Sequence, residues 1–332
     1  MLYFVFAIIA LFCWSGSDLF SKKGTDEKDP NSHWKVTFAV GLIMGVHFII
    51  TLIGGAIIDA TVGVDNLPKF VASLFYTDFK IVDFFMYLPV AGLYILAMVL
   101  GYIGLRYIEL SISSPICNCS GSLALLLCAL IFPLIGAEPI EFDAFIIIGV
   151  LAITFGIIGI GVIDSKENQE LKELRRQESN RKYTKSFLAL LLPIAYLIID
   201  ALGTVGDEVF FHFVDISDYS ANSSFELTFF LLAIFCFIWI KFVKKDKLFA
   251  KKNGALYIGG ACETVGQIFY MAVMFSPYEQ FIPIISAYCV VSVLWSRIFL
   301  KEKLSWKHYL TIAITLIGIL LLGVSEFLGY LA

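Results

Sequence analysis

Ten long apolar segments, each bounded by charged or turn-forming residues, dominate the chain. They cover residues 2–21, 36–58, 84–107, 111–133, 143–163, 187–206, 225–243, 254–275, 279–299 and 307–328. Their lengths are close to the ~20 residues with which a helix crosses a bilayer, and none shows the period-two alternation of a strand. Because backbone polar groups need partners inside a bilayer, the segments predict ten transmembrane helices and an all-α integral membrane protein.

The composition excludes other classes of protein. Of the 332 residues 59% are apolar and only 16% are charged, whereas a soluble domain carries about 25% charged residues. A soluble enzyme, a secreted disulfide scaffold and a disordered chain are therefore excluded. The seven cysteines lie within apolar segments without Cys-x-x-Cys spacing. They predict packing residues rather than a metal or redox centre, and no cofactor is expected.

The basic residues predict the orientation in the membrane. The connections after segments 1, 3, 5, 7 and 9, with the adjoining segment ends, hold 22 of the 24 lysines and arginines. Only Lys69 and Lys80 lie in the other connections. Since cytoplasmic loops are enriched in Lys and Arg, the odd-numbered connections are predicted to be cytoplasmic and both termini extracytoplasmic. A bacterial plasma membrane is the expected location.

The longest polar segment divides the chain into two parts with five apolar segments each. We expect a first repeat over 1–164, a charged cytoplasmic linker over 165–186 and a second repeat over 187–332. The linker mixes both charge signs, as a solvated helix does.

The two halves also resemble each other in sequence. Residues 7–24 align with residues 189–206, which pairs Asp18 with Asp200, and Pro115 recurs as Pro283. Because each half has an odd number of spans, a tandem repeat must be inverted in the membrane. Inverted repeats are the construction of many secondary transporters.

Two stretches carry a resemblance to a known family. Span 1, with ALFCWSGSDLFSKKG, and the C-terminal stretch PIISAYCVVSVLWSRIFLKEKLSWKHYLTIAITLIGILLL resemble the drug/metabolite transporter superfamily, in particular its ten-helix EamA-type transporters. The resemblance covers nearly the whole chain, and GAEPIEF is a weaker copy in the first half. It implies a central cavity built mainly from spans 1, 3, 4, 6, 8 and 9. Characterised ten-helix relatives usually have cytoplasmic termini, and the charge distribution here predicts the reverse.

Acidic residues inside the apolar segments are the first candidates for a binding site. An ionised side chain at mid-membrane costs about 2.5 to 3.5 kcal/mol on insertion scales, so each needs a reason. Glu263 lies near the middle of span 8, and helical spacing puts Gln267, Tyr270 and several glycines on its face. We predict that these three side chains contact the substrate and that Glu263 couples proton movement. The alternative is a tight helix crossing through the glycines.

Spans 1 and 6 carry the second pair of acids. Asp200 shares a helical stripe with Tyr196 and is the other candidate for proton coupling, and Asp18, its repeat mate, shares a face with Trp14. All four are predicted to bind substrate. An ion pair with Lys22, one helical turn away, is the alternative role for Asp18.

Polar stripes on spans 4 and 9 complete the predicted site. Asn118 follows Pro115, whose missing N–H loosens the helix, and Ser286 and Tyr288 follow the equivalent proline in span 9. His47 in span 2 is either a packed, hydrogen-bonded histidine or a proton relay. The predicted substrate-binding residues are Trp14, Asp18, Asn118, Tyr196, Asp200, Glu263, Gln267, Tyr270, Ser286 and Tyr288.

These features predict a secondary active transporter working by alternating access. Carboxylates among aromatic rings favour a cationic or zwitterionic solute, with H⁺ or Na⁺ as the coupling ion. The expected partners are a small-molecule substrate and membrane lipid, without nucleic acid, and the chain is expected to be a monomer or homodimer. An integral membrane enzyme is the alternative, but the four histidines are scattered. A channel and a nucleotide-sugar exchanger are further alternatives, the latter disfavoured by the few basic residues in the predicted cavity.

Overall fold

The computed structural model describes residues 2–26, 28–137, 142–166, 187–250, 253–274 and 282–329, and all regular structure within these ranges is helical. Most of the predicted linker, residues 167–186, lies outside them. The main helices are α1 (Leu2–Gly24), α2 (Ser32–Thr61), α3 (Lys69–Phe75), α4 (Ile81–Gly104), α5 (Leu110–Cys117), α6 (Ser120–Ile135), α7 (Ala144–Lys166), α9 (Leu191–Phe213), α10 (Asp218–Ile238), α11 (Gly254–Met274), α12 (Ile282–Ser286), α13 (Tyr288–Trp295) and α14 (Trp306–Gly329). Each predicted apolar segment coincides with one of these helices or with two consecutive ones.

Six helical stretches within the described residues are long and apolar enough to cross a membrane. They are Leu2–Gly24, Ser32–Thr61, Ile81–Gly104, Leu110–Ile135, Asp218–Val243 and Trp306–Ser325, and Ala144–Ile160 and Ile284–Leu300 are shorter apolar stretches. Helices α9 and α11 are of similar length but carry Asp200, Asp207 and Glu263. An all-α membrane protein is therefore confirmed. Whether α9 and α11 also cross the membrane depends on whether their acidic side chains face the lipid or the interior of the bundle.

Two of the predicted spans are interrupted near their middle. The helix of span 4 breaks at Asn118 and Cys119, between α5 and α6, and that of span 9 breaks at Ala287, between α12 and α13. Pro115 and Pro283 are themselves helical, and each break falls about one turn after its proline. A proline removes the N–H of its own position and crowds the preceding turn, so the hydrogen-bond ladder weakens beside it.

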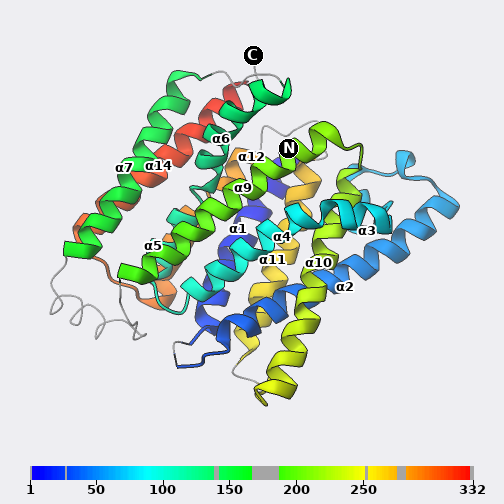
Figure 1. The fold of residues 1–332 in the computed structure, drawn as a ribbon, viewed down its shortest axis with the longest axis horizontal. Helices are drawn as coiled ribbons and strands as arrows, with labels where there is room; N and C mark the ends of the chain where they lie inside the picture. Colours follow the sequence, from blue (N-terminus) through cyan, green and yellow to red (C-terminus); the bar gives the residue numbers. More distant parts are fainter. Residues whose placement is uncertain are drawn as a thin grey trace.

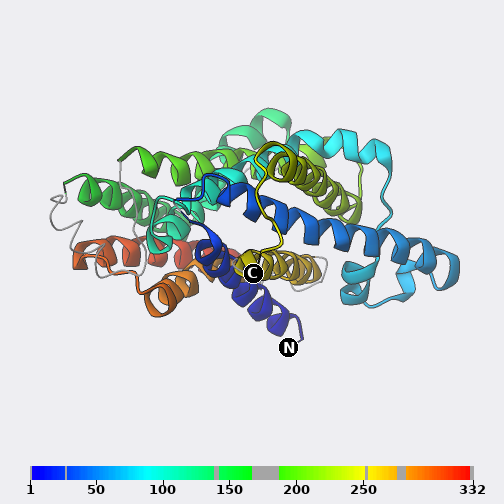
Figure 2. The same ribbon diagram turned by 90° about the horizontal axis from the view of Figure 1, so that it is seen from below.

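Helices from the two halves pack in pairs (Figure 1). Helix α1 lies against α11, α4 against α9, α2 against α10 and α7 against α14. The α7–α14 pair forms one edge of the molecule, the α2–α10 pair lies towards the opposite edge, and the remaining pairs lie between them (Figure 1). The short helix α3 folds back against α2 (Figure 2).

The contact between α2 and α10 is close because α2 has glycines on its contact face. A Cβ atom at Gly41 would lie 2.4 Å from the carbonyl oxygen of Phe229, and one at Gly45 would lie 2.1 Å from the ring of Phe230. Small residues spaced by four let helix backbones approach in a bilayer. The α2–α10 interface is therefore a tightly packed contact between the two halves.

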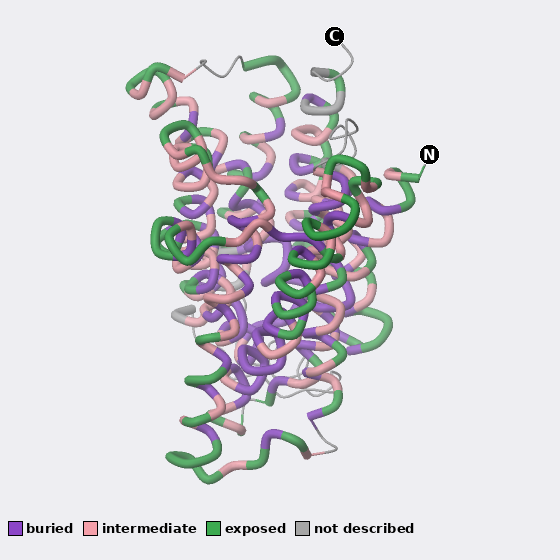
Figure 3. The backbone as a smooth tube through the Cα atoms, turned by 90° about the vertical axis from the view of Figure 1, so that its right-hand side faces the viewer, coloured by how far each residue is buried: buried purple, intermediate pink, exposed green. Residues whose placement is uncertain are grey.

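Exposed residues lie mainly on the outer faces and at the ends of the helices, and buried residues line the faces between them (Figure 3). Large apolar side chains remain on the outside, including Phe85, Leu134 and Phe155, at 66%, 83% and 66% exposure. Water would not favour so much exposed apolar surface, but lipid does.

Polar contacts tie several connections together at one end of the bundle. Lys35, at the start of α2, pairs with Asp246 after α10 at 2.5 Å, and Arg106 after α4 lies 3.5 Å from the His33 ring. Lys22, at the end of α1, donates to the carbonyl of Leu105 at 2.5 Å. The connections that follow α1, α4 and α10 thus lie together, and all of them belong to the basic set.

Acidic residues meet hydroxyl groups at the opposite end of the bundle. Ser220 donates to Asp83 at 2.7 Å, and Ser325 donates to Asp143 at 2.5 Å. These contacts join the start of α4 to that of α10, and the start of α7 to the end of α14.

Candidate functional site

A cavity of about 770 Å³ lies among the central helices. Its volume falls in the range of about 300 to 1,000 Å³ that is usual for small-molecule sites. All ten side chains that the sequence predicts as substrate-binding line it: Trp14, Asp18, Asn118, Tyr196, Asp200, Glu263, Gln267, Tyr270, Ser286 and Tyr288. The structure thus brings the predicted residues together, and their binding of a substrate stays a prediction.

Asp18 is held by a serine of the neighbouring helix. The Ser114 hydroxyl on α5 donates to Asp18 Oδ2 at 2.6 Å. Lys22, the alternative ion-pair partner, is fully buried and donates to the carbonyls of Leu105 and Ile108, at the turn between α4 and α5. A lysine beside the free carbonyls at a helix C-terminus is a stabilising arrangement. Asp18 therefore faces the cavity with a neutral hydrogen-bond donor beside it.

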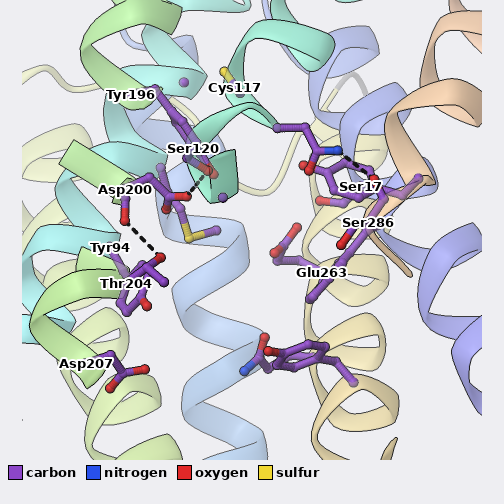
Figure 4. A pocket seen from close by; sticks show the side chains of 18 of the residues that line it. Ser17, Tyr94, Cys117, Ser120, Tyr196, Asp200, Thr204, Asp207, Glu263 and Ser286 are labelled. Atoms are coloured by element: carbon purple, nitrogen blue, oxygen red, sulfur yellow. Dashed lines mark hydrogen bonds between the residues drawn. The ribbon is translucent and has the colours of Figure 1, made fainter. Parts of the chain in front are cut away.

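Asp200 and Asp207 present two carboxylates from the same face of α9. Ser120 on α6 donates to Asp200 Oδ2 at 2.6 Å, and Tyr87 on α4 donates to Asp207 Oδ1 at 2.8 Å. The spacing of seven residues puts both acids on one helical stripe. Figure 4 shows them one above the other on one side of the cavity, with Thr204 between them.

Glu263 lies on the other side of the cavity. It comes from α11, and Ser17 and Ser286 lie near it (Figure 4). Gly266 leaves room on the same helix, since a Cβ there would lie 2.5 Å from the indole ring of Trp14. The glycines of α11 therefore admit α1 closely, as the helix-crossing interpretation expects. The same approach leaves Glu263 in the cavity wall, so the two interpretations are compatible.

Aromatic rings form a continuous patch of the wall near Glu263. The ring of Trp14 lies 5.3 Å from that of Tyr270 and 5.8 Å from that of Tyr288, measured between centroids. Tilted and edge-on pairs at these separations are favourable, and their ring faces attract cations.

The two interrupted helices meet at the cavity wall. Asn118 Nδ2 donates to the carbonyl of Ser286 at 2.6 Å and to Cys289 Sγ at 3.1 Å. The Ser286 carbonyl lies just before the break at Ala287. Asn118 therefore satisfies a backbone group in the wall, in addition to lining the cavity.

Helix α4 contributes wall residues that the sequence did not identify individually, although the family resemblance implied its span. Tyr87, Tyr94 and Tyr102 of α4 line the cavity, as do Met98 and Gly101. Their spacing in the sequence indicates a shared face, because Tyr87, Tyr94 and Gly101 are seven residues apart and so lie on one helical stripe. A tyrosine in a membrane span is equally suited to the lipid interface, so its sequence position alone does not show which way it faces.

Helix α10 contributes a second group that was not predicted. Asn222 lines the cavity and accepts a hydrogen bond at 3.2 Å from Gln267. His47 lies outside the cavity lining, and its Nδ1 is 2.7 Å from Oε1 of Glu226 on α10. His47 is therefore packed and hydrogen-bonded, and a role as a proton relay stays a prediction.

The charge of the wall is one-sided among the described residues. The lining includes six carboxylates, and none of its described members is a lysine, arginine or histidine. The six are Asp18, Asp200, Asp207, Glu208, Asp218 and Glu263. A cavity with these walls attracts cations and repels anions.

Helices with apolar outer faces around a cavity that contains carboxylates are typical of a membrane transporter. Comparison with known families supports this class: the profile of the EamA-like transporter family matches residues 188–324. This match confirms the resemblance seen in the sequence: residues 188–324 are similar to the EamA-like transporter family of the drug/metabolite transporter superfamily.

Other comparisons add little. No curated protein matches the chain in sequence. A solved structure described only as "Crystal structure of protein" is similar over 98% of this chain and 97% of its own, at 12% identity and a TM-score of 0.48.

Proposed function

We propose that the protein is a secondary active transporter that moves a small cationic or zwitterionic solute across the membrane by alternating access. The observation that carries this proposal is the wall of the cavity, with six carboxylates and aromatic rings and, among its described residues, no basic side chain. A bound amine pairs with the carboxylates and stacks its charge on the ring faces, each cation–π contact contributing about 0.5 to 2 kcal/mol.

The same proposal includes ten membrane crossings in two inverted repeats. Exchange of the halves relates α1 to α9, α4 to α11, α2 to α10 and α7 to α14. Under this exchange the contact of α1 with α11 becomes that of α9 with α4, and the contacts of α2 with α10 and of α7 with α14 map onto themselves. The alignment that pairs Pro115 with Pro283 also pairs Asn118 with Ser286, which are hydrogen-bonded to each other. This pattern supports a pseudo-two-fold axis through the cavity.

The acids of α9 and α11 are compatible with membrane-spanning helices. Their carboxylates line the cavity and so avoid the lipid. Intramembrane acids that face a cavity are typical of transport pathways. Proton coupling through Glu263 or Asp200 belongs to the same proposal.

A nucleotide-sugar exchanger is the less suitable alternative within the transporters. Its diphosphate substrate would need arginine or lysine partners. The described residues of the wall offer acids instead. An integral membrane enzyme is also less suitable, because no group of three His, Cys, Asp or Glu side chains in the described part of the chain is arranged to hold a metal.

The central experiment measures uptake of labelled amines and amino acids into proteoliposomes by the Glu263→Gln and Asp200→Asn variants. Loss of one charged partner costs about 1.5 to 3 kcal/mol, so we expect KM for a cationic solute to rise about 10- to 150-fold. Asp83→Asn is the matched control, because Asp83 bonds Ser220 outside the cavity. Unchanged, still pH-dependent uptake by Glu263→Gln would exclude its coupling role. Uptake restricted to phosphorylated sugars would refute the cation preference.

The proposed orientation puts the basic end of the bundle in the cytoplasm and both termini outside. Single cysteines in place of the exposed residues Lys244 and Asp65 test it with a membrane-impermeant thiol reagent. We expect labelling at position 65 in intact cells and at position 244 only after lysis. The reverse pattern would show the termini to be cytoplasmic.

A further inference from the structure

A carboxyl–imidazole pair lies in the helix bundle outside the cavity lining. His47 on α2 and Glu226 on α10 approach to 2.7 Å between Nδ1 and Oε1, and their side chains are only 8% and 0% exposed. The pair spans the close α2–α10 contact and so joins the two halves of the chain. Glu226 Oε2 is fully buried and has no hydrogen-bond partner among the described residues.

The charge of this pair depends on a single proton. With Glu226 ionised and His47 neutral, the pair carries one negative charge in a buried site, where the desolvation penalty is several kcal/mol. One added proton makes the net charge zero, whether it resides on the imidazole as an ion pair or on the carboxyl group.

The charged residues of the neighbouring helices have other partners or positions. Asp83 of α4 bonds Ser220, while Asp18 of α1 and Glu263 of α11 line the cavity. Lys69, the charged residue of α3, is exposed. The charge of the pair is therefore set by its own proton rather than by a fixed neighbouring charge.

A chain of two amides connects the pair to the cavity. Gln267 Nε2 donates to Asn222 Oδ1 at 3.2 Å, and Asn222 Nδ2 donates to Glu226 Oε1 at 3.4 Å. Gln267 and Asn222 both line the cavity, whereas Glu226 and His47 do not. Asn222 thus lies between the buried carboxyl group and the substrate space.

We infer that His47 and Glu226 form a proton-binding site separate from the substrate cavity, and that Asn222 and Gln267 couple the occupancy of this site to the cavity. The inference rests on the proposed transport function and adds a second location for the coupling ion. One proton from the aqueous phase binds, one N–H or O–H bond forms, and the charge of the pair changes from −1 to 0. No electron is transferred.

Protonation changes what the amide chain can do. Glu226 Oε1 accepts from both His47 and Asn222 while the carboxyl group is ionised. If the added proton is on the imidazole, the imidazolium holds the carboxylate more strongly than the neutral ring does, and if it is on the carboxyl group, that group becomes a weaker acceptor. In either case the long Asn222 contact weakens first, and Asn222 is free to reorient. Gln267 then loses its fixed acceptor and presents a different hydrogen-bond pattern to a ligand. The pair itself stays on the tightly packed α2–α10 contact.

The test follows the imidazole of His47 by NMR of histidine-labelled protein in nanodiscs between pH 4 and pH 9. The probe is the proton, and His47→Gln assigns the resonances among the four histidines. In Glu226→Gln we expect the midpoint of the His47 titration to move to lower pH by about one unit or more, because the imidazolium loses its counter-charge. In Asn222→Ala and Gln267→Ala we expect it to move by about 0.3 unit or more, as loss of a neutral hydrogen bond predicts.

Thr228→Val is the matched control on α10. The Thr228 hydroxyl donates to the Ser224 carbonyl of its own helix at 2.7 Å, so its removal should leave the titration of His47 unchanged. An unchanged midpoint in Glu226→Gln would overturn the proton site. An unchanged midpoint in Gln267→Ala would overturn the coupling to the cavity.

A transport measurement separates this inference from the proposed function. The pH profile of amine uptake should flatten in both Glu226→Gln and His47→Gln, so a folding defect in one variant leaves the other informative. If no amine or amino acid is transported by the unmodified protein, the proposed function fails while the NMR titration still decides the proton site. If transport is intact and its pH profile is preserved in both variants, the pair has no coupling role, and the proposed transport function is not affected.

Discussion

Replacing Glu302 by alanine should destabilise the protein strongly, because this carboxylate closes the N-terminus of α5. Glu302 is 1% exposed and follows the bend after α13. It accepts hydrogen bonds from the backbone N–H groups of Leu110 and Ser111 at 2.9 and 3.0 Å, and from the Ser111 hydroxyl at 2.8 Å. The first N–H groups of a helix have no partner in the helix itself, and their partial positive charge favours an acid.

The magnitude follows from these three contacts. A hydrogen bond to a charged group contributes about 1.5 to 3 kcal/mol. Neighbouring contacts are not additive, so we expect Glu302→Ala to cost about 3 to 5 kcal/mol rather than the full sum. The unfolding entropy of a chain of 332 residues corresponds to about 1.4 °C per kcal/mol, so the melting temperature should fall by about 4 to 7 °C.

The assay is thermal unfolding of the purified protein in detergent, followed by tryptophan fluorescence. Glu302→Gln should be intermediate, because its amide keeps one carbonyl acceptor and places an NH₂ group against the other donor. Lys307→Ala, at an exposed position of α14, is the control and should change the melting temperature little. A melting temperature for Glu302→Ala within about 2 °C of the unmodified protein would refute this account of α5.

Two further substitutions test the packing and the basic end of the bundle. Gly41→Ala should lower the melting temperature by overpacking the α2–α10 contact, at a cost of about 1 to 3 kcal/mol, whereas Gly92→Ala, where an added Cβ meets no atom within 4 Å, should be neutral or stabilising. Equal effects of the two would contradict the close contact. The hydrogen bond from Lys35 lowers the pKa of Asp246 below its ordinary value of 3.8, so the stability from this contact is present above that value and is lost as the pH falls below it. Lys35→Met should raise the pKa of Asp246 towards 3.8, measured by carboxyl NMR, and an unmoved titration would show that the ammonium group does not act on it.

The positions of the binding residues were largely predictable because polar groups are rare in the apolar segments. Asp18, Asp200 and Glu263 each lie within an otherwise apolar helix, where exposure to lipid is costly. Such residues turn towards a cavity or a partner, and the structure places all three in the lining of one cavity. The same reasoning did not reach Tyr87 and Tyr94, because a tyrosine is tolerated at several depths in a membrane.

The partners of the predicted residues were not predictable in this way. Sequence spacing suggested Lys22 as a partner of Asp18. In the structure Ser114 donates to Asp18, and Lys22 donates to backbone carbonyls between α4 and α5. His47 left two roles open until Glu226 was found beside it, 179 residues further along the chain. Contacts over such separations depend on how the helices pack, which their individual periodicity does not contain.

The sequence by itself determined that the chain is an all-α membrane protein, which family it resembles and which ten residues were candidates for a site. It could do so because hydropathy, helix length and the cost of an intramembrane charge are local properties of a segment. Only the tertiary structure decided that the ten residues share one cavity, which residues of α4 line it, that α10 also contributes to its wall, and that His47 and Glu226 meet outside it. Those facts depend on which helices lie side by side, and that arrangement is set by packing between segments far apart in the chain.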